Sequence, residues 1–302
     1  MIIAHVIGGL GNQMFQYAAA RAMAQSCGQS LALDISGFDG FAPHQGFELF
    51  NKFEGPSQSA LIASPADIRE VLGWAAVNPA LRLLKLHQLA WLRPQSLVLE
   101  PHFGYWPGFR QRCASSPHLT PHAFLCGYWQ SEKYFCDIEA VIRQEFRFKP
   151  AVNIENAGFI DKINAVNAVS LHVRRGDYVQ NPATLSVHGV CSVAYYQSAI
   201  QYIEQRVPNP HFFVFSDDMQ WTAENLRIKA PHELVVHNRG ADSFNDMRLM
   251  SQCRHHVVAN SSFSWWGAWL NACPDKIVVA PENWFARPKN TQDLIPANWV
   301  RL

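Results

Sequence analysis

From residue 168 to residue 280, short apolar runs alternate with stretches whose apolar residues have helical spacing. We expect strands at 168–173, 211–216, 233–236, 256–259 and 276–280, and helices at 193–207, 221–229, 242–252 and 264–272. Strands that alternate with helices form a parallel sheet with helices on its faces. This region is therefore predicted to be a Rossmann-like domain.

The chain opens with the same kind of unit. An apolar run at 2–7 leads into the turn Gly8-Gly9-Leu10-Gly11, then into helical spacing at 12–27 and a second apolar run at 31–34. This βαβ pattern favours another parallel sheet, and the less regular stretch up to about residue 150 suits a lobe elaborated with loops. We predict an α/β fold with two Rossmann-like domains facing across a cleft. The first domain is expected at 1–155 and the second at 156–302, with the last residues packing back on the first domain.

The composition limits the ligands. The 302 residues are 48% hydrophobic, which is enough apolar material for two cores. The formal net charge is +1, so there is no general electrostatic reason to bind nucleic acid or an anionic membrane. An anion must therefore be held by a local cluster of cations.

The seven cysteines are scattered and form no C-x-x-C pair, which predicts reduced thiols in the cytosol and no zinc site or disulfide framework. No basic leader precedes the apolar residues 2–7, and no apolar run approaches the length of a membrane-spanning helix. The leucine-rich stretch 81–93 is expected to pack on the first domain, with a membrane-surface helix as the alternative. The expected location is the cytoplasm, with at most a peripheral contact at the inner face of the membrane.

The strand expected at 168–173 leads into His172-Val173-Arg174-Arg175-Gly176-Asp177-Tyr178. Ligands of α/β proteins bind at the carboxyl ends of strands, and the planar guanidinium fork of arginine binds phosphate oxygens. The motif therefore predicts a receptor for a phosphorylated ligand. The structural alternative is an arginine pair that forms salt bridges with Asp177 and a neighbouring carboxylate.

Three other segments could contribute to the same site. The glycine turn at 8–11 lets backbone N–H groups approach a ligand, although it could be a tight turn without one. Asp217 follows the strand expected at 211–216 and could accept hydrogen bonds from guanine or a ribose, bind a metal with Asp218, or cap the next helix. Serines at 261 and 262 could cap a helix and donate to a phosphate, with Phe263 beside them, whereas Trp265 and Trp269 are expected in the core.

Taken together, these motifs resemble a known family. The matching strings are GGLGNQMFQY at 8–17, GYWQSEKYF at 127–135, HVRRGDY at 172–178, FSDD at 215–218 and NSSFSWWG at 260–267. They look like the motifs of glycosyltransferase family 11, the α-1,2-fucosyltransferases that use GDP-fucose. The resemblance covers nearly the whole chain, with the motifs in the expected order.

The resemblance implies a GT-B-like fold and an inverting transfer of L-fucose from GDP-β-L-fucose to the 2-hydroxyl of a terminal β-galactoside. It also implies no essential metal or other cofactor. The expected partners are GDP-fucose and a β-galactoside-containing oligosaccharide or glycolipid-linked precursor, and no nucleic acid.

The resemblance also assigns residues. Arg174 and His172 are the expected catalytic residues, and Arg174 is expected to hold the β-phosphate as GDP leaves. The expected nucleotide-sugar contacts are Gly11, Asn12, His172, Arg174, Asp217, Ser261, Ser262 and Phe263. Arg175 and Asp177 are expected to support the loop. The catalytic base stays unassigned, because Asp34, Glu132 and Asp177 are candidates by chemistry alone and water could take the proton.

Two other functions fit parts of the sequence. Gly9-x-Gly11 after a first strand, with Asp34 at the end of a second, approaches the fingerprint of a nicotinamide-dependent oxidoreductase, although Met14 occupies the place of the third glycine. A non-catalytic GDP-sugar-binding or glycan-binding protein is the other alternative, with the aromatic-rich region 102–135 stacking on sugars.

Overall fold

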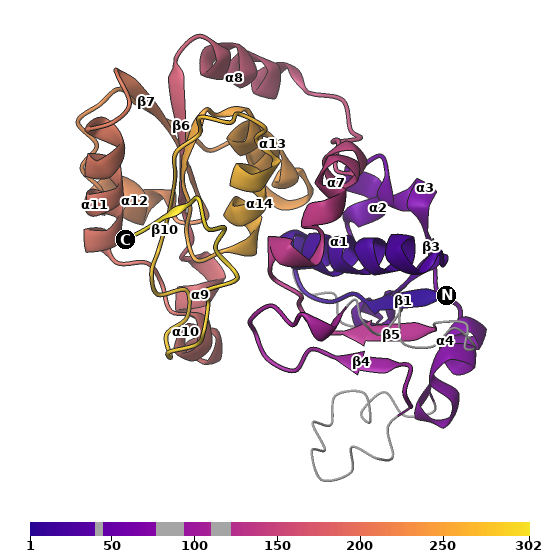
Figure 1. Ribbon diagram of the computed structural model, residues 1–302. Helices are drawn as coiled ribbons and strands as arrows, with labels where there is room; N and C mark the ends of the chain where they lie inside the picture. Colours follow the sequence, from indigo (N-terminus) through magenta and orange to yellow (C-terminus); the bar gives the residue numbers. More distant parts are fainter. Residues whose placement is uncertain (40–44, 77–93, 110–121) are drawn as a thin grey trace. The chain divides into compact units, whose positions relative to one another are not determined.

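The computed structural model describes residues 1–39, 45–76, 94–109 and 122–302. It divides into two compact units (Figure 1). Unit 1 consists of Met1–Pro150 and Gln292–Leu294, and unit 2 consists of Ala151–Thr291 and Ile295–Leu302. Each unit is built on its own parallel sheet.

The sheet of unit 1 has the strand order β3-β2-β1-β5-β4. Its strands are β1 (Ile2–His5), β2 (Leu31–Asp34), β3 (Ala60–Ile62), β4 (Leu97–Leu99) and β5 (Ala123–Cys126), and all pairings are parallel. Strand β5 lies next to β1 and β4 lies at the edge, so the loops that follow β1 and β5 are neighbours at the carboxyl end of the sheet.

Helices cover both faces of this sheet (Figure 1). They are α1 (Leu10–Cys27), α2 (Leu49–Lys52), α3 (Pro56–Ser59), α4 (Pro65–Leu72) and α7 (Glu139–Glu145), with 3₁₀ turns at Ser36–Phe38, Gly73–Ala76, Glu132–Tyr134 and Cys136–Ile138. The alanine-rich α1 is buried along most of its length and ends at Gly28, which adopts the left-handed conformation. On the other face, α4 packs Ile68 and Leu72 against a core that includes Ile3.

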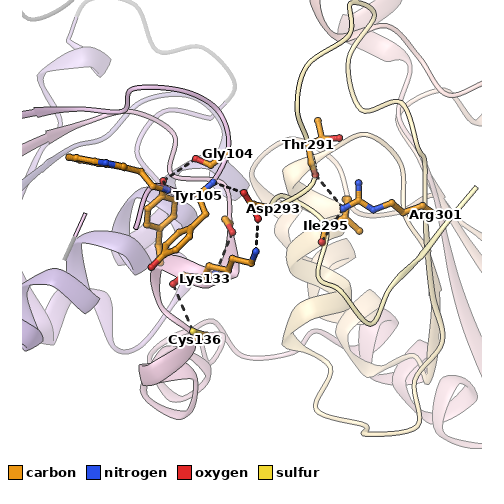
Figure 2. Close-up of polar contacts among 11 residues, drawn as sticks. Gly104, Tyr105, Lys133, Cys136, Thr291, Asp293, Ile295 and Arg301 are labelled. Carbon is orange, nitrogen blue, oxygen red and sulfur yellow. Dashed lines mark hydrogen bonds and ion pairs between the residues drawn. The ribbon is translucent and has the colours of Figure 1, made fainter. Parts of the chain in front are cut away.

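Three residues near the carboxyl terminus, Gln292–Leu294, belong to unit 1. Asp293 accepts hydrogen bonds from the backbone N–H of Tyr105 and from Lys133 Nζ (Figure 2). Within unit 2, Arg301 donates to the carbonyl oxygens of Thr291 and Ile295. The segment Gln292–Leu294 is therefore held by polar contacts within unit 1, and its flanking residues are held by polar contacts within unit 2.

The sheet of unit 2 has the order β11-β10-β9-β6-β7-β8, again entirely parallel. Its strands are β6 (Asn167–Val173), β7 (Pro210–Ser216), β8 (His232–Val235), β9 (His255–Val257), β10 (Val278–Ala280) and β11 (Val300–Arg301). Counted within the unit, this is the strand order 3-2-1-4-5-6 of dinucleotide-binding domains. The order changes direction between β6 and β9.

Unit 2 has helices on both faces of its sheet (Figure 1). They are α8 (Ile154–Asn164), α9 (Gly176–Gln180), α10 (Pro182–His188), α11 (Val193–Glu204), α12 (Met219–Asn225), α13 (Phe244–Gln252) and α14 (Ser262–Leu270), with a 3₁₀ turn at Gly240–Asp242. Leu171 of β6 packs in one core with residues of α11. Ala168 of β6 and Phe213 of β7 pack in a second core with residues of α8 and α13. Both faces of the central strands are thus buried, which explains their continuous apolar runs.

The predicted α/β fold with Rossmann-like domains is confirmed. Every strand and helix expected between 168 and 280 is present, with ends shifted by a few residues. In unit 2, the helices α8, α9 and α10 and the strand β11 were not predicted, nor were the three strands after β2 in unit 1. The stretch 81–93 lies outside the described residues.

The prediction of reduced thiols needs a correction. Cys27 is disulfide-bonded, whereas the described cysteines that form no disulfide are Cys126, Cys136, Cys191, Cys253 and Cys273. The prediction is therefore wrong for Cys27, because spacing along the chain does not show which cysteines a fold brings together. Among the described helices, none is both long and apolar enough to cross a membrane.

Candidate functional site

The reversal of strand order in unit 2 brings two of the predicted motifs together. The arginine motif follows β6 and the serine motif follows β9, and these strands are neighbours in the sheet. The rings of His172 and Phe263 meet there, with 6.0 Å between their centroids. This switch point is where a ligand of such a sheet binds.

Arg174 is oriented by a carboxylate on the next strand. Its Nη1 lies 3.0 Å from Oδ2 of Asp217, and its guanidinium lies 5.4 Å from the centre of the Tyr178 ring. The other oxygen of Asp217 accepts a hydrogen bond of 2.8 Å from the backbone N–H of Arg175. Val173 of β6 and Ser216 of β7 are register partners, so the residues that follow them lie side by side. Asp217 therefore holds both the Arg174 side chain and the backbone of its loop.

Arg175 has a different set of contacts. Its guanidinium stacks on the Trp221 ring at 3.8 Å, and its Nε lies 3.6 Å from the Asp218 carboxylate. Asp218 also caps α12 by accepting a hydrogen bond from the backbone N–H of Trp221. These contacts tie Arg175 to the start of α12. The aspartates after β7 are thus ion-pair partners of the two arginines among the described residues. The side chain of Asp177 lies outside the described part of the structure.

Gly176 is needed because the Asp217 carboxylate approaches the loop closely. A Cβ at residue 176 would lie 2.9 Å from Oδ2 of Asp217. Any side chain there would press on the carboxylate that holds Arg174.

His172 is buried and neutral at physiological pH. The pKa of His172 is lowered to about 4, chiefly by burial. The charge of Asp217 opposes this shift, and the positive charge of Arg174 adds to it. Its Nδ1 is buried and has no hydrogen-bond partner in the described residues. A buried polar atom of this kind costs free energy unless a ligand or water satisfies it, so His172 is suited to hydrogen-bond an uncharged group.

The loop after β9 is locked by Asn260, which the sequence reasoning did not single out. Its amide donates to the carbonyl oxygens of His188 and Gly189, and its Oδ1 accepts from the Cys191 thiol. The side chain of Ser261 caps α14 by accepting from the backbone N–H of Phe263. An asparagine directly before a helix-capping serine was the available sequence indication of this anchor.

Ser262 and the tryptophans complete this segment. Ser262 is the first residue of α14 and is half-buried. Trp265, Trp266 and Trp269 are buried, and the rings of Trp265 and Trp269 stack at 6.1 Å. The expected packing role of Trp265 and Trp269 is confirmed.

The glycine turn of unit 1 lies at the carboxyl end of β1, next to the loop that follows β5. Gly8 has a φ of +78°, and a Cβ on it would lie 2.8 Å from Nδ2 of Asn12. The Oδ1 of Asn12 accepts a hydrogen bond of 2.7 Å from Nε2 of Gln130, which follows β5. Gly11 is buried in the first turn of α1. Asn12 therefore joins the loops that follow β1 and β5.

Two glutamines of the same motif hold loops in place. Gln13 donates to the carbonyl oxygens of Gly8 and Gly46 and accepts from the backbone N–H of Glu48. Gln16 accepts from the backbone N–H of Ile7 and donates to the carbonyl oxygen of Gly127. Both side chains are buried. Much of this motif is thus explained by the architecture of the turn.

The candidates for the catalytic base come from three separate segments of the chain. Asp34 ends β2 and lies 3.2 Å from Nδ1 of His5. Burial alone would raise its pKa, but the hydrogen bonds from His5 and Ser36 outweigh burial and lower the pKa of Asp34 to about 2. A carboxylate with so low a pKa is a weak base. Glu132 is half-buried at the start of a 3₁₀ turn.

The paired aspartates after β7 do not face each other as metal ligands. Asp217 binds Arg174, and Asp218 binds Arg175 and caps α12. Within the described ranges, no group of three or more histidine, cysteine, aspartate and glutamate side chains could hold a metal ion.

Comparisons with known proteins agree with these motifs. Residues 96–302 match the model of glycosyl transferase family 11. An α-1,2-colitosyltransferase of Escherichia coli is 33% identical over 309 residues, covering 100% of this chain and 99% of that protein. The galactoside 2-α-L-fucosyltransferase SEC1 of Bos taurus is 31% identical over 154 residues, covering 48% of this chain and 41% of that protein.

A solved structure supports the fold. The fucosyltransferase NodZ from Bradyrhizobium superposes with a TM-score of 0.51 at 14% identity, over 88% of this chain and 91% of that chain. The fold is therefore GT-B-like. The chain belongs to glycosyltransferase family 11.

Proposed function

We propose that this protein transfers L-fucose from GDP-β-L-fucose to the 2-hydroxyl of a terminal β-galactoside, inverting the anomeric carbon to form an α-1,2 linkage. The main support for the proposal is the position of Arg174, a cation held by Asp217 at the switch point of a dinucleotide-type sheet. Membership of glycosyltransferase family 11 supports the reaction class. The fucosyltransferase activity in the name of SEC1 supports fucose and galactoside as the substrates to test.

The geometry suits the departure of a diphosphate. Glycosyl transfer passes through an oxocarbenium-like transition state, in which negative charge builds up on the leaving group. The guanidinium of Arg174 donates hydrogen bonds in a fixed fork and keeps its charge. Because Asp217 already orients it, little reorganisation is needed as the charge develops. Arg174 is therefore proposed as the β-phosphate ligand that stabilises GDP as it leaves.

The neighbours of Arg174 are proposed to bind the rest of the donor. Neutral His172 offers an unsatisfied Nδ1 to an uncharged group, and Phe263 packs beside its ring. Ser261 and Ser262 lie at the amino terminus of α14, where hydroxyl and N–H groups attract phosphate. Gly11 and Asn12 are proposed as donor contacts from the family resemblance alone.

Asp217 is proposed to act through Arg174. Sequence reasoning assigned it to guanosine, but one of its oxygens binds the Arg174 side chain and the other binds the backbone of Arg175. A carboxylate engaged in this way positions the phosphate ligand. We further propose that no metal or other cofactor is required, since a fixed guanidinium can neutralise the charge that a metal ion would otherwise neutralise.

The proposed acceptor is a β-galactoside-containing oligosaccharide or glycolipid-linked precursor. The proposed location is cytoplasmic, with at most a peripheral contact at the inner face of the membrane. Nucleic acid is not a proposed partner, because the formal net charge is only +1.

The two alternative functions lose their support. The chain belongs to a family of transferases, and the carboxylate of Asp34 is held by His5 and Ser36, so it is not presented as a ribose ligand. Membership of a glycosyltransferase family also disfavours a non-catalytic GDP-sugar-binding or glycan-binding protein. Both alternatives are therefore set aside in favour of glycosyl transfer.

The test is a donor and acceptor panel. The protein is incubated with GDP-fucose or GDP-colitose, the second because one relative is a colitosyltransferase, together with several β-galactosides and with or without EDTA. The expected product is α-1,2-fucosylated and forms at the same rate in EDTA. Transfer from GDP-colitose alone, or a linkage to another hydroxyl, would overturn the proposal.

A further inference from the structure

Tyr128 is an exposed aromatic residue at the carboxyl end of the sheet of unit 1. It lies in the loop that follows β5, which pairs in parallel with β1 and β4. The Tyr128 side chain is 40% exposed, whereas that of the next residue, Trp129, is 1% exposed. A ring directed to solvent at the carboxyl end of a parallel sheet is placed where ligands bind.

The backbone of this loop is fixed by Glu100, which follows the neighbouring strand β4. Its carboxylate accepts hydrogen bonds from the N–H groups of Tyr128, at 2.8 Å, and Trp129, at 3.0 Å. A Cβ on Gly127 would lie 2.4 Å from Cβ of Glu100, so only glycine lets the two loops approach this closely. Tyr128 is thus presented on a rigid support.

Trp129 adopts a backbone conformation that bulky residues avoid. Its φ is +54°, in the left-handed region. Its ring packs against Phe109 and Tyr134, with centroid distances of 4.9 and 5.5 Å. The turn sends Trp129 inward and leaves Tyr128 outside. Strain of this kind persists where the surrounding contacts over-determine it, and it is typical of functional loops.

The other end of the loop is tied to α1. Gln130 donates to Asn12, and Gln16 donates to the carbonyl oxygen of Gly127. Three separate anchors therefore hold a loop of four residues: Glu100 directly after β4, Asn12 in the first turn of α1 and Gln16 in its second turn. This degree of fixation exceeds what a simple surface connection requires.

We propose that Tyr128 is the platform on which the galactose ring of the acceptor stacks, and that it determines acceptor specificity in the reaction proposed above. One face of β-galactose carries C–H groups, because the axial 4-hydroxyl points to the opposite face. Such a face packs on the negative face of an aromatic ring, and a pre-positioned ring contributes affinity with little loss of side-chain freedom. The inference rests on the proposed function for its choice of sugar.

The kinetic test separates acceptor binding from donor binding. In Tyr128→Ala, we expect the KM for methyl β-D-galactoside to rise about tenfold or more, while the KM for GDP-fucose stays within about twofold. Tyr128→Phe keeps the ring and should stay close to wild type. Leu61→Ala removes a side chain that is 67% exposed on β3 and serves as the matched surface control.

A binding measurement distinguishes this inference from the proposed function. Saturation-transfer NMR of methyl β-D-galactoside with the full chain reports ring contact without turnover. Saturation of the sugar C–H groups by wild type and Tyr128→Phe, lost in Tyr128→Ala, supports the platform even if GDP-fucose proves not to be the donor. Equal saturation in Tyr128→Ala and wild type, or none in wild type, would overturn it.

Discussion

Nη1 of Arg174 and Oδ2 of Asp217 lie 3.0 Å apart, although the two residues are 43 positions apart in the chain. They meet because β6 and β7 are neighbours in the sheet. The pair places a charged hydrogen-bond donor at the switch point of the sheet and fixes its direction. Both side chains are about a quarter exposed, so the pair is accessible to a ligand. The proposed role of Arg174 as the β-phosphate ligand depends on this ion pair.

Asp217→Asn tests whether orientation of Arg174 contributes to turnover. The amide oxygen can still accept from the backbone of Arg175, but the ionic partner of Arg174 is lost. We expect kcat to fall roughly ten- to hundredfold, the range expected when a catalytic group is slightly misplaced. Steady-state kinetics check this, with Asp218→Asn as the control. A kcat equal to that of wild type would show that Asp217 does not position Arg174.

Gly176→Ala tests the same relationship by steric means. The new Cβ would lie 2.9 Å from the Asp217 carboxylate, so the carboxylate must move away from Arg174. We expect kcat to fall as in Asp217→Asn, with the secondary structure preserved by circular dichroism. Gly158→Ala is the matched control, because a Cβ on that exposed residue of α8 meets nothing within 4 Å. Full activity in Gly176→Ala would contradict the proposed tight packing.

The buried His172 predicts a pH dependence of stability. Its pKa is lowered from 6.5 to about 4 by burial, so the unfolded chain binds more protons than the folded chain between these values. Stability should therefore fall as the pH drops from about 6.5 toward 4. His256, whose pKa is also lowered by burial, acts in the same direction.

Urea unfolding of wild type and His172→Gln at pH 7 and pH 5 measures the His172 contribution. The variant should lose less stability on acidification, and the remaining loss is assigned to His256 and other groups. An identical loss in both proteins would mean that His172 does not titrate as the structure predicts.

Lys276 predicts a stability effect away from the site. Its Nζ donates to the carbonyl oxygens of Ala268 and Asn271, both at 2.7 Å, and so satisfies the carboxyl end of α14. Lys276→Met should lower the free energy of unfolding by about 1.5–3 kcal/mol, the range for hydrogen bonds to charged groups. Lys162→Met, which breaks an exposed pair with Glu233, should cost less than about 1 kcal/mol. Equal losses measured by urea unfolding would refute this ranking.

The sequence predicted unit 2 well because its strands are buried on both faces. Continuous apolar runs such as 211–216 then stand out from their polar surroundings. The ends of helices were less accurate, since they depend on caps. Helix α12, capped by Asp218, begins two residues before its expected start. Helix α14, capped by Ser261, also begins two residues early.

Unit 1 was harder to predict beyond β2. Its later strands have only three or four residues, and β3 lies at an edge with Leu61 and Ile62 exposed. Short edge strands carry little periodicity, so a pattern of two-residue alternation is not visible. The loop anchors Glu100 and Gln130 could not be foreseen, because they join segments whose neighbourhood is set by the sheet order.

Within the site, the sequence indicated which residues meet but not which partners they choose. His172, Arg174, Asp217 and Ser261 each lie at or just after the end of a strand, and parallel neighbours bring such positions to one edge. The engagement of Asp217 by Arg174 depends on the register of β6 and β7, in which Val173 pairs with Ser216. Register between distant strands leaves no local pattern in a chain.

The most direct test of the proposed role of Arg174 is the transfer rate of the purified Arg174→Ala variant with GDP-fucose and a β-galactoside acceptor. Removal of a pre-oriented cationic donor to the leaving group is expected to lower kcat by about 10²–10³-fold, with the thermal unfolding profile unchanged. The Asp217 carboxylate, which loses its partner in this variant, remains hydrated because it is partly exposed. Near-normal turnover in the folded Arg174→Ala protein would contradict the proposal that Arg174 stabilises the departing diphosphate.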